Sequence, residues 1–162
     1  MTRLIIAMWM AGTLLAGCAA APTSPARSAK PYLEQALIDG RLVIGGQPSA
    51  SDFPLFDQQG IRKVINLRPD AEMASLATFD EPALAGAHGM SYLSLPIGGS
   101  DHPYTPEVLD RFAEAMAESE GKVLLHCASG ARAGQLYAAY LVKFEGRSPE
   151  EALRTVAGTG AW

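Results

Sequence analysis

The stretch KVLLHCASGARAG, residues 122–134, decides how this chain is expected to fold. Its first five residues form a short apolar run, which is typical of a buried strand. Four small residues follow at 128–131, and apolar residues then repeat at helical spacing from about 133 to 145. The stretch therefore predicts a strand, a tight turn and a helix, which is the repeating unit of an α/β sheet.

The rest of the chain predicts the same alternation of strands and helices. Apolar or alternating runs predict strands at 42–44, 63–67 and 90–96, and capping residues, prolines and apolar stripes predict helices at 52–60, 105–121 and 148–157, with a partly helical segment at 77–89. This order indicates a mainly parallel sheet of four to five strands with helices on both faces. We expect one α/β domain over residues 31–162.

Cys127 lies where the predicted strand ends and the turn begins, which is the usual ligand site of a parallel sheet. The small residues Ala128, Ser129, Gly130 and Ala131 allow the backbone to point several N–H groups into one hollow, as in an anion-binding nest. The following helix adds partial positive charge, and both effects lower the pKa of a thiol. Arg132 can hold two oxygens of a tetrahedral anion. The loop thus predicts a nucleophilic cysteine in a phosphate-sized cradle.

The N-terminus has the features of an export signal. One basic residue precedes a 13-residue apolar core, which is shorter than the roughly 20 residues of a spanning helix. LAGC, residues 15–18, resembles the lipobox of bacterial lipoproteins, which implies cleavage after residue 17 and a lipid on Cys18. Alanine at position 19 favours the outer membrane by the same resemblance. We expect a signal peptide at 1–17, a flexible tether at 18–30 and a periplasmic domain.

The expected export of the chain affects how its two cysteines and its net charge are interpreted. With Cys18 lipidated, Cys127 has no partner for a disulfide, so it is either buried and inert or kept for chemistry. Loss of Arg3 leaves 12 Lys and Arg against 17 Asp and Glu, a net charge of −5. This mildly acidic chain has no basic run, so nucleic acid is not an expected partner.

Four segments carry a family resemblance: GGQPSASDF, GIRKVINLRPDAE, YLSLPI and VLLHCASGARAG. In this order they resemble small bacterial dual-specificity-phosphatase-like proteins, which are related to the phosphatase-like domain of beta-lactamase hydrolase-like proteins. The resemblance implies a cysteine-phosphatase fold, with Cys127 as the nucleophile and Arg132 as the oxyanion ligand. It also implies Asp101 as the general acid, with Asp80 and Glu81 as alternatives.

Two further residues have expected roles at the same edge of the sheet. In the family, the histidine before the nucleophile orients the loop and supports the thiolate, which is the role implied for His126. Arg68 follows the VINL strand and would meet either the substrate or an acidic partner. The histidines are scattered and no glycine-rich nucleotide motif is present, so neither a metal nor a cofactor is expected.

The spacing of the cysteine loop keeps three functions open. The larger phosphatase superfamily has five residues between cysteine and arginine and then Ser or Thr, whereas here four residues separate Cys127 from Arg132 and Ala133 follows. Four residues are also the spacing of rhodanese-like sulfurtransferases. The expected function is therefore phosphate monoester hydrolysis through a cysteinyl-phosphate. The alternatives are sulfur transfer by the same thiol and anion binding without catalysis.

Overall fold

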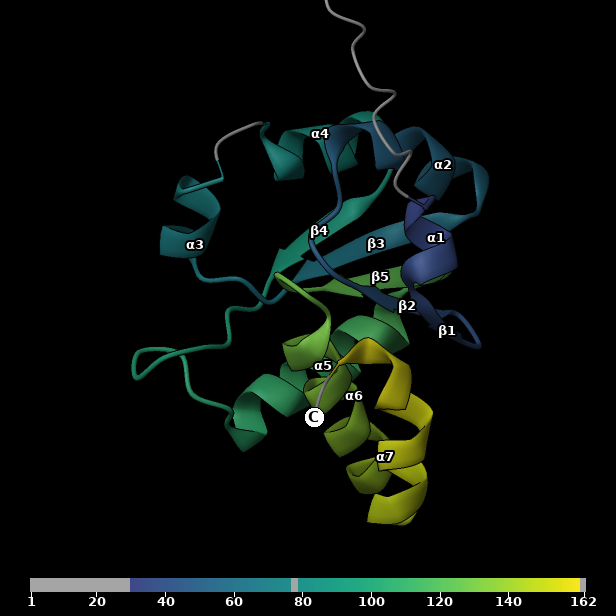
Figure 1. Ribbon diagram of the computed structural model, residues 1–162, viewed down its shortest axis with the longest axis vertical. Helices are drawn as coiled ribbons and strands as arrows, with labels where there is room; N and C mark the ends of the chain where they lie inside the picture. The colour runs from purple at the N-terminus through teal and green to yellow at the C-terminus, as the bar shows by residue number, and fades with distance from the viewer. Residues whose placement is uncertain (1–29, 77–78, 161–162) are drawn as a thin grey trace, which may run out of the picture.

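The computed structural model describes residues 30–76 and 79–160, which form a sheet covered by helices on both faces (Figure 1). The strands are β1 (Leu37–Asp39), β2 (Leu42–Gly45), β3 (Ile61–Asn66), β4 (Ser91–Ser94) and β5 (Lys122–His126). Their order in the sheet is β1-β2-β5-β3-β4. β2, β5, β3 and β4 run parallel, and only the edge strand β1 pairs in the antiparallel direction among the described strands.

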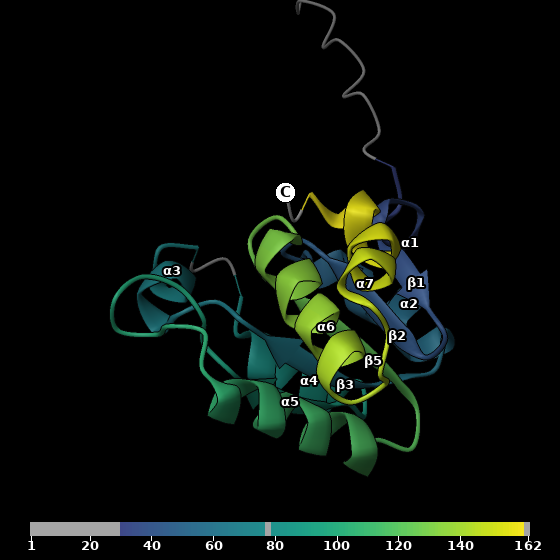
Figure 2. The ribbon, with the colours of Figure 1, turned by 90° about the horizontal axis from the view of Figure 1, so that it is seen from below.

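The helices divide between the two faces of the sheet. They are α1 (Tyr32–Gln35), α2 (Phe53–Gln58), α3 (Asp70–Ala74), α4 (Glu81–Ala87), α5 (Pro106–Glu118), α6 (Ala131–Lys143) and α7 (Pro149–Val156), with short 3₁₀ turns at Ala50–Asp52 and Ala157–Thr159. α1, α2 and α4 lie on one side of the sheet, and α5, α6 and α7 cover the other side (Figures 1 and 2). α3 lies beyond the carboxyl end of β3.

The central strand β5 shows why the sheet is buried on both faces. Alternate side chains of a strand point to opposite faces. Val123 and Leu125 pack into the core beneath α5–α7, whereas Leu124 packs into the second core with Phe53 and Phe56 of α2. Because both faces are covered, the strand is a continuous apolar run, as expected for a parallel sheet.

Local signals in the sequence set several helix ends. Thr105 caps α5, since its hydroxyl oxygen accepts from the N–H of Val108, and the prolines that follow Thr105 and Ser148 occupy the first helical position. Ser148 and Glu151 form the predicted capping box of α7. Asp52 occupies the predicted N-cap position of α2, but its side chain makes no cap hydrogen bond to that helix and instead accepts from the N–H of Ser49 in the preceding 3₁₀ turn.

The predicted α/β class, the mainly parallel sheet and the helices on both faces are confirmed. Three short elements were not predicted, namely α1, β1 and α3. Each has five residues or fewer, which is too short to show a periodic pattern. α6 starts at Ala131, earlier than predicted, because small residues of the turn already take helical geometry there.

The predicted signal peptide, Cys18 and most of the tether lie outside the described residues. No helix within 30–76 and 79–160 combines the length and the apolar character needed to cross a membrane.

Candidate active site

Cys127 lies at the carboxyl end of β5, in the middle of the sheet. β5 is flanked by β2 and β3, and the N–H of Cys127 donates to the carbonyl oxygen of Gly45 at 3.4 Å. Only 1% of Cys127 is exposed, whereas the next two residues, Ala128 and Ser129, are exposed. The thiol therefore sits at the base of a loop whose rim faces solvent.

The loop surrounds the sulfur with backbone N–H donors. The N–H of Gly130 donates to Sγ of Cys127 at 3.1 Å. Burial raises the pKa of the Cys127 thiol, but hydrogen bonds from the backbone N–H groups of Ala133, Ser129, Gly130 and Arg132 outweigh it, so the net pKa is below the ordinary value. A low thiol pKa means more thiolate near neutral pH, and the thiolate is the nucleophilic form.

Gly130 is the residue that allows this turn to form. Its φ of +100° lies in the left-handed region, which L side chains seldom adopt, and it precedes the first turn of α6. A Cβ at this position would lie 3.1 Å from the carbonyl oxygen of Thr159. The conformation and the close contact both favour glycine at this position, where the backbone N–H donates to the sulfur.

Arg132 is held from outside the loop by a carboxylate of α3. Nη1 and Nη2 of Arg132 donate to the two oxygens of Glu72 at 2.9 and 2.7 Å, and Nη1 also donates to the carbonyl oxygen of Ile97 at 2.6 Å. The Glu72 carboxylate raises the pKa of Arg132, and Arg132 in turn lowers the pKa of Glu72. Cys127 makes a smaller contribution to the raised pKa of Arg132.

The hydrogen bonds of Arg132 to Glu72 and Ile97 leave part of its guanidinium group available to a ligand. A guanidinium has five N–H groups, and the bonds to Glu72 and Ile97 use three of them. Nε and one hydrogen of Nη2 have no oxygen acceptor among the described residues, and Cys127 is the other group that interacts with this guanidinium. Together with the loop amides they can bind a tetrahedral anion next to the thiol.

Arg68 and Gln47 extend the polar network behind Arg132. Arg68 is 8% exposed, its Nε donates to Glu72 at 3.1 Å, and its Nη1 donates to Oε1 of Gln47 at 3.1 Å. Of the two roles expected for Arg68, the structure contains the ion pair with an acidic partner. Glu72 thus bridges two arginines, and the pair provides the positive charge at this edge of the sheet.

His126 points to the opposite face of the sheet from Cys127. Its Nε2 lies 2.8 Å from Oε1 of Glu81, and both side chains are fully buried. The contact is close, but its direction is not that of a hydrogen bond, and Nδ1 has no hydrogen-bond partner within the described ranges. The other carboxylate oxygen of Glu81 accepts from Nε2 of Gln47 at 3.2 Å.

Asp101 lies in the loop between β4 and α5, which extends from the sheet at the same end as α3 (Figures 1 and 2). The side chain is exposed and accepts from the hydroxyl of Ser100 at 3.0 Å. No hydrogen bond or ion pair within 30–76 and 79–160 joins it to Cys127 or Arg132. Of the two alternative acids, Asp80 caps α4 by accepting from Ala83, and Glu81 contacts His126.

Tyr104, from the same loop, reaches the active-site helix. Its hydroxyl lies 3.0 Å from the carbonyl oxygen of Arg132 and 2.9 Å from Oε1 of Gln135, so its single proton serves one acceptor at a time. Burial, with a smaller contribution from the nearby Cys127, raises the pKa of Tyr104 to about 12. Tyr104 is therefore neutral at physiological pH and acts as a hydrogen-bond donor.

The structure thus brings together Cys127, the loop 128–131 and Arg132, and it places Arg68 behind them and Asp101 apart. Three residues of this site, Gln47, Glu72 and Tyr104, were not predicted from the sequence, nor was the contact of Glu81 with His126. Glu72 stands in the acidic first turn of α3, which was the available signal for it. Within the described part of the chain, no group of three or more acidic, histidine or cysteine side chains could hold a metal ion.

Most of the described domain is similar to known proteins. Residues 36–141 match the family described as the phosphatase-like domain of beta-lactamase hydrolase-like protein. The beta-lactamase hydrolase-like proteins of Agrobacterium fabrum and Xylella fastidiosa are each 42% identical to this chain over 101 and 102 residues. These matches cover 62% of this chain and only 23% of each relative.

Solved structures share the fold. A protein of Shewanella putrefaciens, provisionally described as a phosphatase, is 30% identical, with a TM-score of 0.62 over 76% of this chain and 75% of its own. The active form of Tk-PTP is 25% identical, with a TM-score of 0.61 over 78% of this chain and 84% of its own.

Proposed function

This chain belongs to the family of the phosphatase-like domain of beta-lactamase hydrolase-like proteins, and on that premise we propose that it hydrolyses phosphate monoesters through Cys127. The family and the structural neighbours support a phosphatase-like hydrolase of the cysteine type. The proposal adds the covalent mechanism and chemistry of the tyrosine or dual-specificity class. The observation that carries it is a thiol of lowered pKa within a ring of backbone amides, next to an arginine fixed by Glu72.

The proposed reaction has two steps. The Cys127 thiolate attacks phosphorus, an S–P bond forms, and the bond from phosphorus to the ester oxygen breaks with its electron pair on that oxygen. Water then attacks the cysteinyl-phosphate and releases phosphate and the thiolate. The amides of residues 128–131 and the free edge of Arg132 stabilise the charge on the three phosphoryl oxygens in both steps.

Asp101 is our proposed general acid for the leaving oxygen. Its loop contains Gly98 and Gly99, both with positive φ, and is closed by a short backbone pairing between Gly98 and His102. A Cβ at Gly98 would lie 2.9 Å from Nη1 of Arg132, so the start of this loop already touches the arginine. A positioned acid is typically worth ~10²–10⁴ in rate.

Sulfur transfer is the second candidate, and a specific observation favours it. The loop has four residues between Cys127 and Arg132, and the buried Ala133 takes the place where the superfamily has a hydroxyl. Asp101 lies apart from the thiol, and sulfur transfer needs no such acid. In this reaction the thiolate attacks the outer sulfur of thiosulfate, an S–S bond forms and sulfite leaves. A thiophilic acceptor then removes the sulfur.

The test compares both reactions on the same reduced, full-length chain. Hydrolysis of p-nitrophenyl phosphate and sulfur transfer from thiosulfate to cyanide are measured for the wild type and for Cys127→Ser. We expect phosphatase turnover that Cys127→Ser abolishes. Cysteine-dependent thiocyanate formation without hydrolysis would replace the proposal with the sulfurtransferase. A folded protein without either activity would indicate an anion-binding protein without catalysis.

A further inference from the structure

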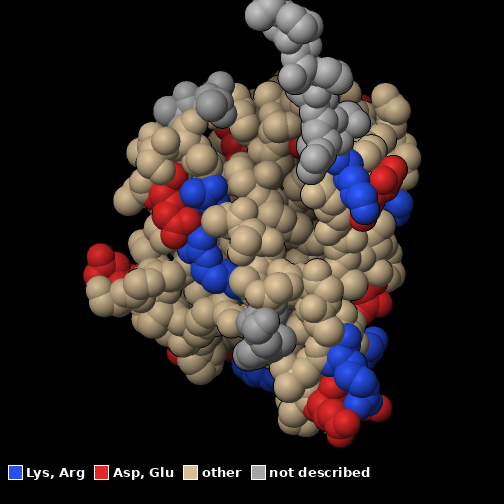
Figure 3. Space-filling view, in the orientation of Figure 1, with Lys and Arg blue, Asp and Glu red and all other residues tan. Residues whose placement is uncertain are grey.

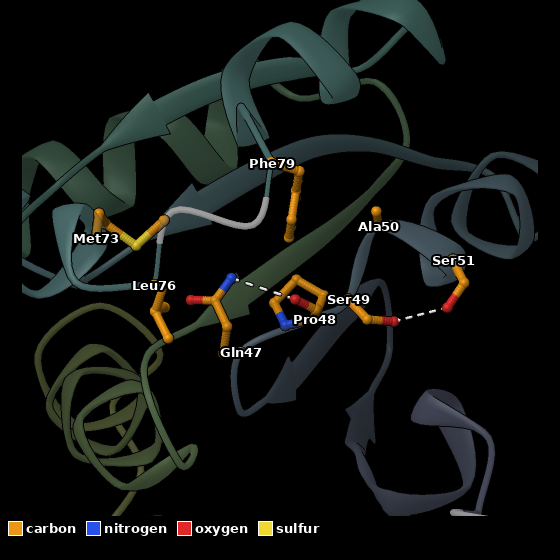
Figure 4. A pocket seen from close by; sticks show the side chains of 8 residues that line it. All are labelled: Gln47, Pro48, Ser49, Ala50, Ser51, Met73, Leu76 and Phe79. Carbon is orange, nitrogen blue, oxygen red and sulfur yellow. Dashed lines mark hydrogen bonds between the residues drawn. The ribbon is translucent and has the colours of Figure 1, made fainter.

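Gln47 contacts three separate parts of the site, although it lies outside the cysteine loop. It belongs to the turn that follows β2, and Figure 4 shows its side chain projecting from that turn toward the segment of Met73 and Leu76. Its backbone bonds to the cysteine loop, and its side chain bonds to an arginine and to a buried carboxylate. These partners connect Gln47 to both the thiol and the arginine of the site.

The backbone of Gln47 orients one amide of the cysteine loop. Its N–H donates to the carbonyl oxygen of Ala128 at 3.1 Å. In a trans peptide unit the C=O and N–H groups point in opposite directions. The N–H of Ser129, which shares this peptide unit, therefore points away from Gln47, and it is one of the donors that lower the pKa of Cys127. This contact involves no atom of the Gln47 side chain.

The side-chain amide of Gln47 bridges a cation and a carboxylate. Its Oε1 accepts from Nη1 of Arg68 at 3.1 Å, and its Nε2 donates to Oε2 of Glu81 at 3.2 Å. Nε2 also donates to the carbonyl oxygen of Pro48 at 3.3 Å. An arginine only donates hydrogen bonds and a carboxylate only accepts them, so the side chain between them has to do both. An amide meets this requirement.

Both partners of the amide are buried, which makes the bridge necessary. Arg68 is 8% exposed and Glu81 is 1% exposed. A buried charged group is costly unless hydrogen bonds replace those it would make with water. Glu81 is also packed against His126, whose Nε2 lies 2.8 Å from Oε1. One end of the bridge is thus fixed in the core, and Gln47 holds Arg68 relative to it.

Arg68 shares the carboxylate of Glu72 with Arg132. Nε of Arg68 donates to Oε2 of Glu72 at 3.1 Å, and Nη2 of Arg132 donates to the same oxygen at 2.7 Å. Because one oxygen serves both guanidinium groups, a displacement of Arg68 changes the position of the carboxylate that holds Arg132. Figure 3 shows blue and red atoms side by side over α3, the helix that carries Glu72. Gln47 is therefore connected to the anion-binding arginine through two side chains.

We propose that the side chain of Gln47 is a positioning residue for Arg132 and acts through Arg68 and Glu72. This inference rests on the proposed function, since it takes the loop 127–132 as the phosphate site, and it adds a requirement for an amide in the turn after β2. The side chain serves the arginine, whereas the backbone serves the thiol. Removal of the side chain alone should weaken phosphate binding and leave the thiol unchanged.

Gln47→Met separates these two contacts. Methionine is similar in length, keeps the backbone N–H, cannot donate to Glu81 and is only a weak acceptor for Arg68. Calorimetry measures inorganic phosphate binding to the full-length Cys127→Ser protein, and we expect added Gln47→Met to weaken the affinity about tenfold. In the protein that retains Cys127, the thiolate absorbance at 240 nm, taken as the difference from the matching Cys127→Ser protein, should keep the wild-type midpoint.

Gln35→Met is the matched control. Gln35 lines a hollow of about 320 Å³ together with Gln47 and Ser129, so it also lies near the cysteine loop. Its Nε2 donates to the carbonyl oxygen of Lys30, outside the chain of contacts that leads to Arg132. The same exchange at this position should change neither the phosphate affinity nor the thiolate midpoint.

The outcomes separate this inference from the proposed function. Unchanged phosphate affinity in Gln47→Met, or an equal loss in Gln35→Met, would overturn the positioning role even where the wild type hydrolyses phosphate esters. A loss accompanied by a raised thiolate midpoint would also overturn it, because the whole loop would then be disturbed. A loss of phosphate affinity alone, confined to Gln47→Met, would support the role even if turnover is absent.

A measurement on the wild type needs no variant to fold. Gln47 and Glu72 hold Arg68 at Nη1 and Nε, so rotation of its guanidinium group should be slow. In the ¹⁵N NMR spectrum of the full-length protein, we expect separate signals for the two Nη groups of Arg68. A single averaged signal would show that the guanidinium rotates freely, and it would overturn the bridge from Gln47 to Arg132.

Discussion

Cys127 is nearly inaccessible, yet its surroundings favour the charged form of its side chain. Burial in an apolar core alone would raise the pKa and leave an inert thiol. Here the hydrogen bonds from the loop amides lower the pKa by more than burial raises it. One of these bonds is donated by the N–H of Gly130, which lies 3.1 Å from the sulfur. The balance between these two effects is what distinguishes a catalytic cysteine from a core residue.

The lowered pKa of Cys127 predicts how thiolate content changes with pH. Absorbance at 240 nm, measured as the difference between the wild type and Cys127→Ser, should titrate with a midpoint below the ordinary thiol value of ~8.5. Because folding lowers the pKa of Cys127, the thiolate contributes its full stabilisation of the folded state at pH values above the pKa that Cys127 has in the unfolded chain. This stabilisation is lost as the pH falls through the pKa of Cys127 in the folded state. A midpoint at or above ~8.5 would contradict an amide cradle.

Glu72 is predicted to position Arg132 for its ligand. Glu72→Gln replaces one carboxylate oxygen with an amide nitrogen, so it removes the paired hydrogen bonds that orient the guanidinium. We expect kcat/KM for p-nitrophenyl phosphate to fall by roughly 10–100-fold, because catalysis is sensitive to small misplacements. The thiolate titration of Cys127 should still show a lowered midpoint.

Glu150→Gln is the matched control for Glu72→Gln. Glu150 pairs with Arg154 on the exposed face of α7, so the same change there removes an ion pair remote from the cysteine loop. Unchanged kinetics in Glu150→Gln together with a loss in Glu72→Gln would support positioning. Equal kinetics in both variants would exclude it.

Only part of this site could be predicted from the sequence, and the reason is physical. Cys127 and Arg132 lie in one continuous segment, so local spacing predicted their proximity. Glu72 lies 60 residues before Arg132 and meets it only because β3 neighbours β5 in the sheet. Gln47 meets Arg68 for a similar reason, since β2 pairs with the other edge of β5. Contacts of this kind depend on strand order, which the chain's local pattern does not encode.

At the scale of elements, the turn between β5 and α6 depends on Gly130, whose positive φ lets the chain pass from the strand into the helix. We predict that Gly130→Ala costs about 1–2 kcal/mol in unfolding free energy, because alanine is disfavoured at φ +100°. It should also raise the thiol pKa of Cys127, since the Gly130 N–H would turn away from the sulfur. Chemical denaturation and the thiolate titration measure these two effects.

Gly86→Ala controls for the change of residue type. Gly86 lies within α4 with open space around its Cα, and its φ is not positive. Alanine there should leave the pKa of Cys127 unchanged and should not lower stability, given the better helix propensity of alanine. If Gly130→Ala behaved like Gly86→Ala, the strained turn would have no role in the site.

Elements with strong local signals were predictable, whereas short ones were not. α5 and α7 carry a capping residue, a proline at the first position and an apolar stripe, and their starts agree with prediction. α3 has five residues, and its Glu72 bonds to two arginines from other segments of the chain. A helix this short shows no periodic pattern, so its acidic first turn was the only local signal for it.

At the scale of the whole molecule, the described domain contains every residue proposed for catalysis. The loop 127–132, Glu72, Arg68 and Asp101 all lie within residues 30–76 and 79–160. The proposed lipid anchor at Cys18 lies before this domain, and the segment between is rich in Ala, Pro and Ser. On this basis the anchor and the active site should be separable functions.

Cys18→Ala tests the anchor and its independence from the site. In a host that processes lipoproteins, we expect the wild type to incorporate labelled palmitate and to sediment with membranes, and Cys18→Ala to do neither, because it lacks the thiol proposed to carry the lipid. The variant should keep the kcat/KM of the wild type for p-nitrophenyl phosphate. Cys127→Ser should show the reverse pattern, with labelling retained and hydrolysis lost. Labelling that persists in Cys18→Ala would refute the anchor, and hydrolysis lost with Cys18 would show that the two functions are coupled.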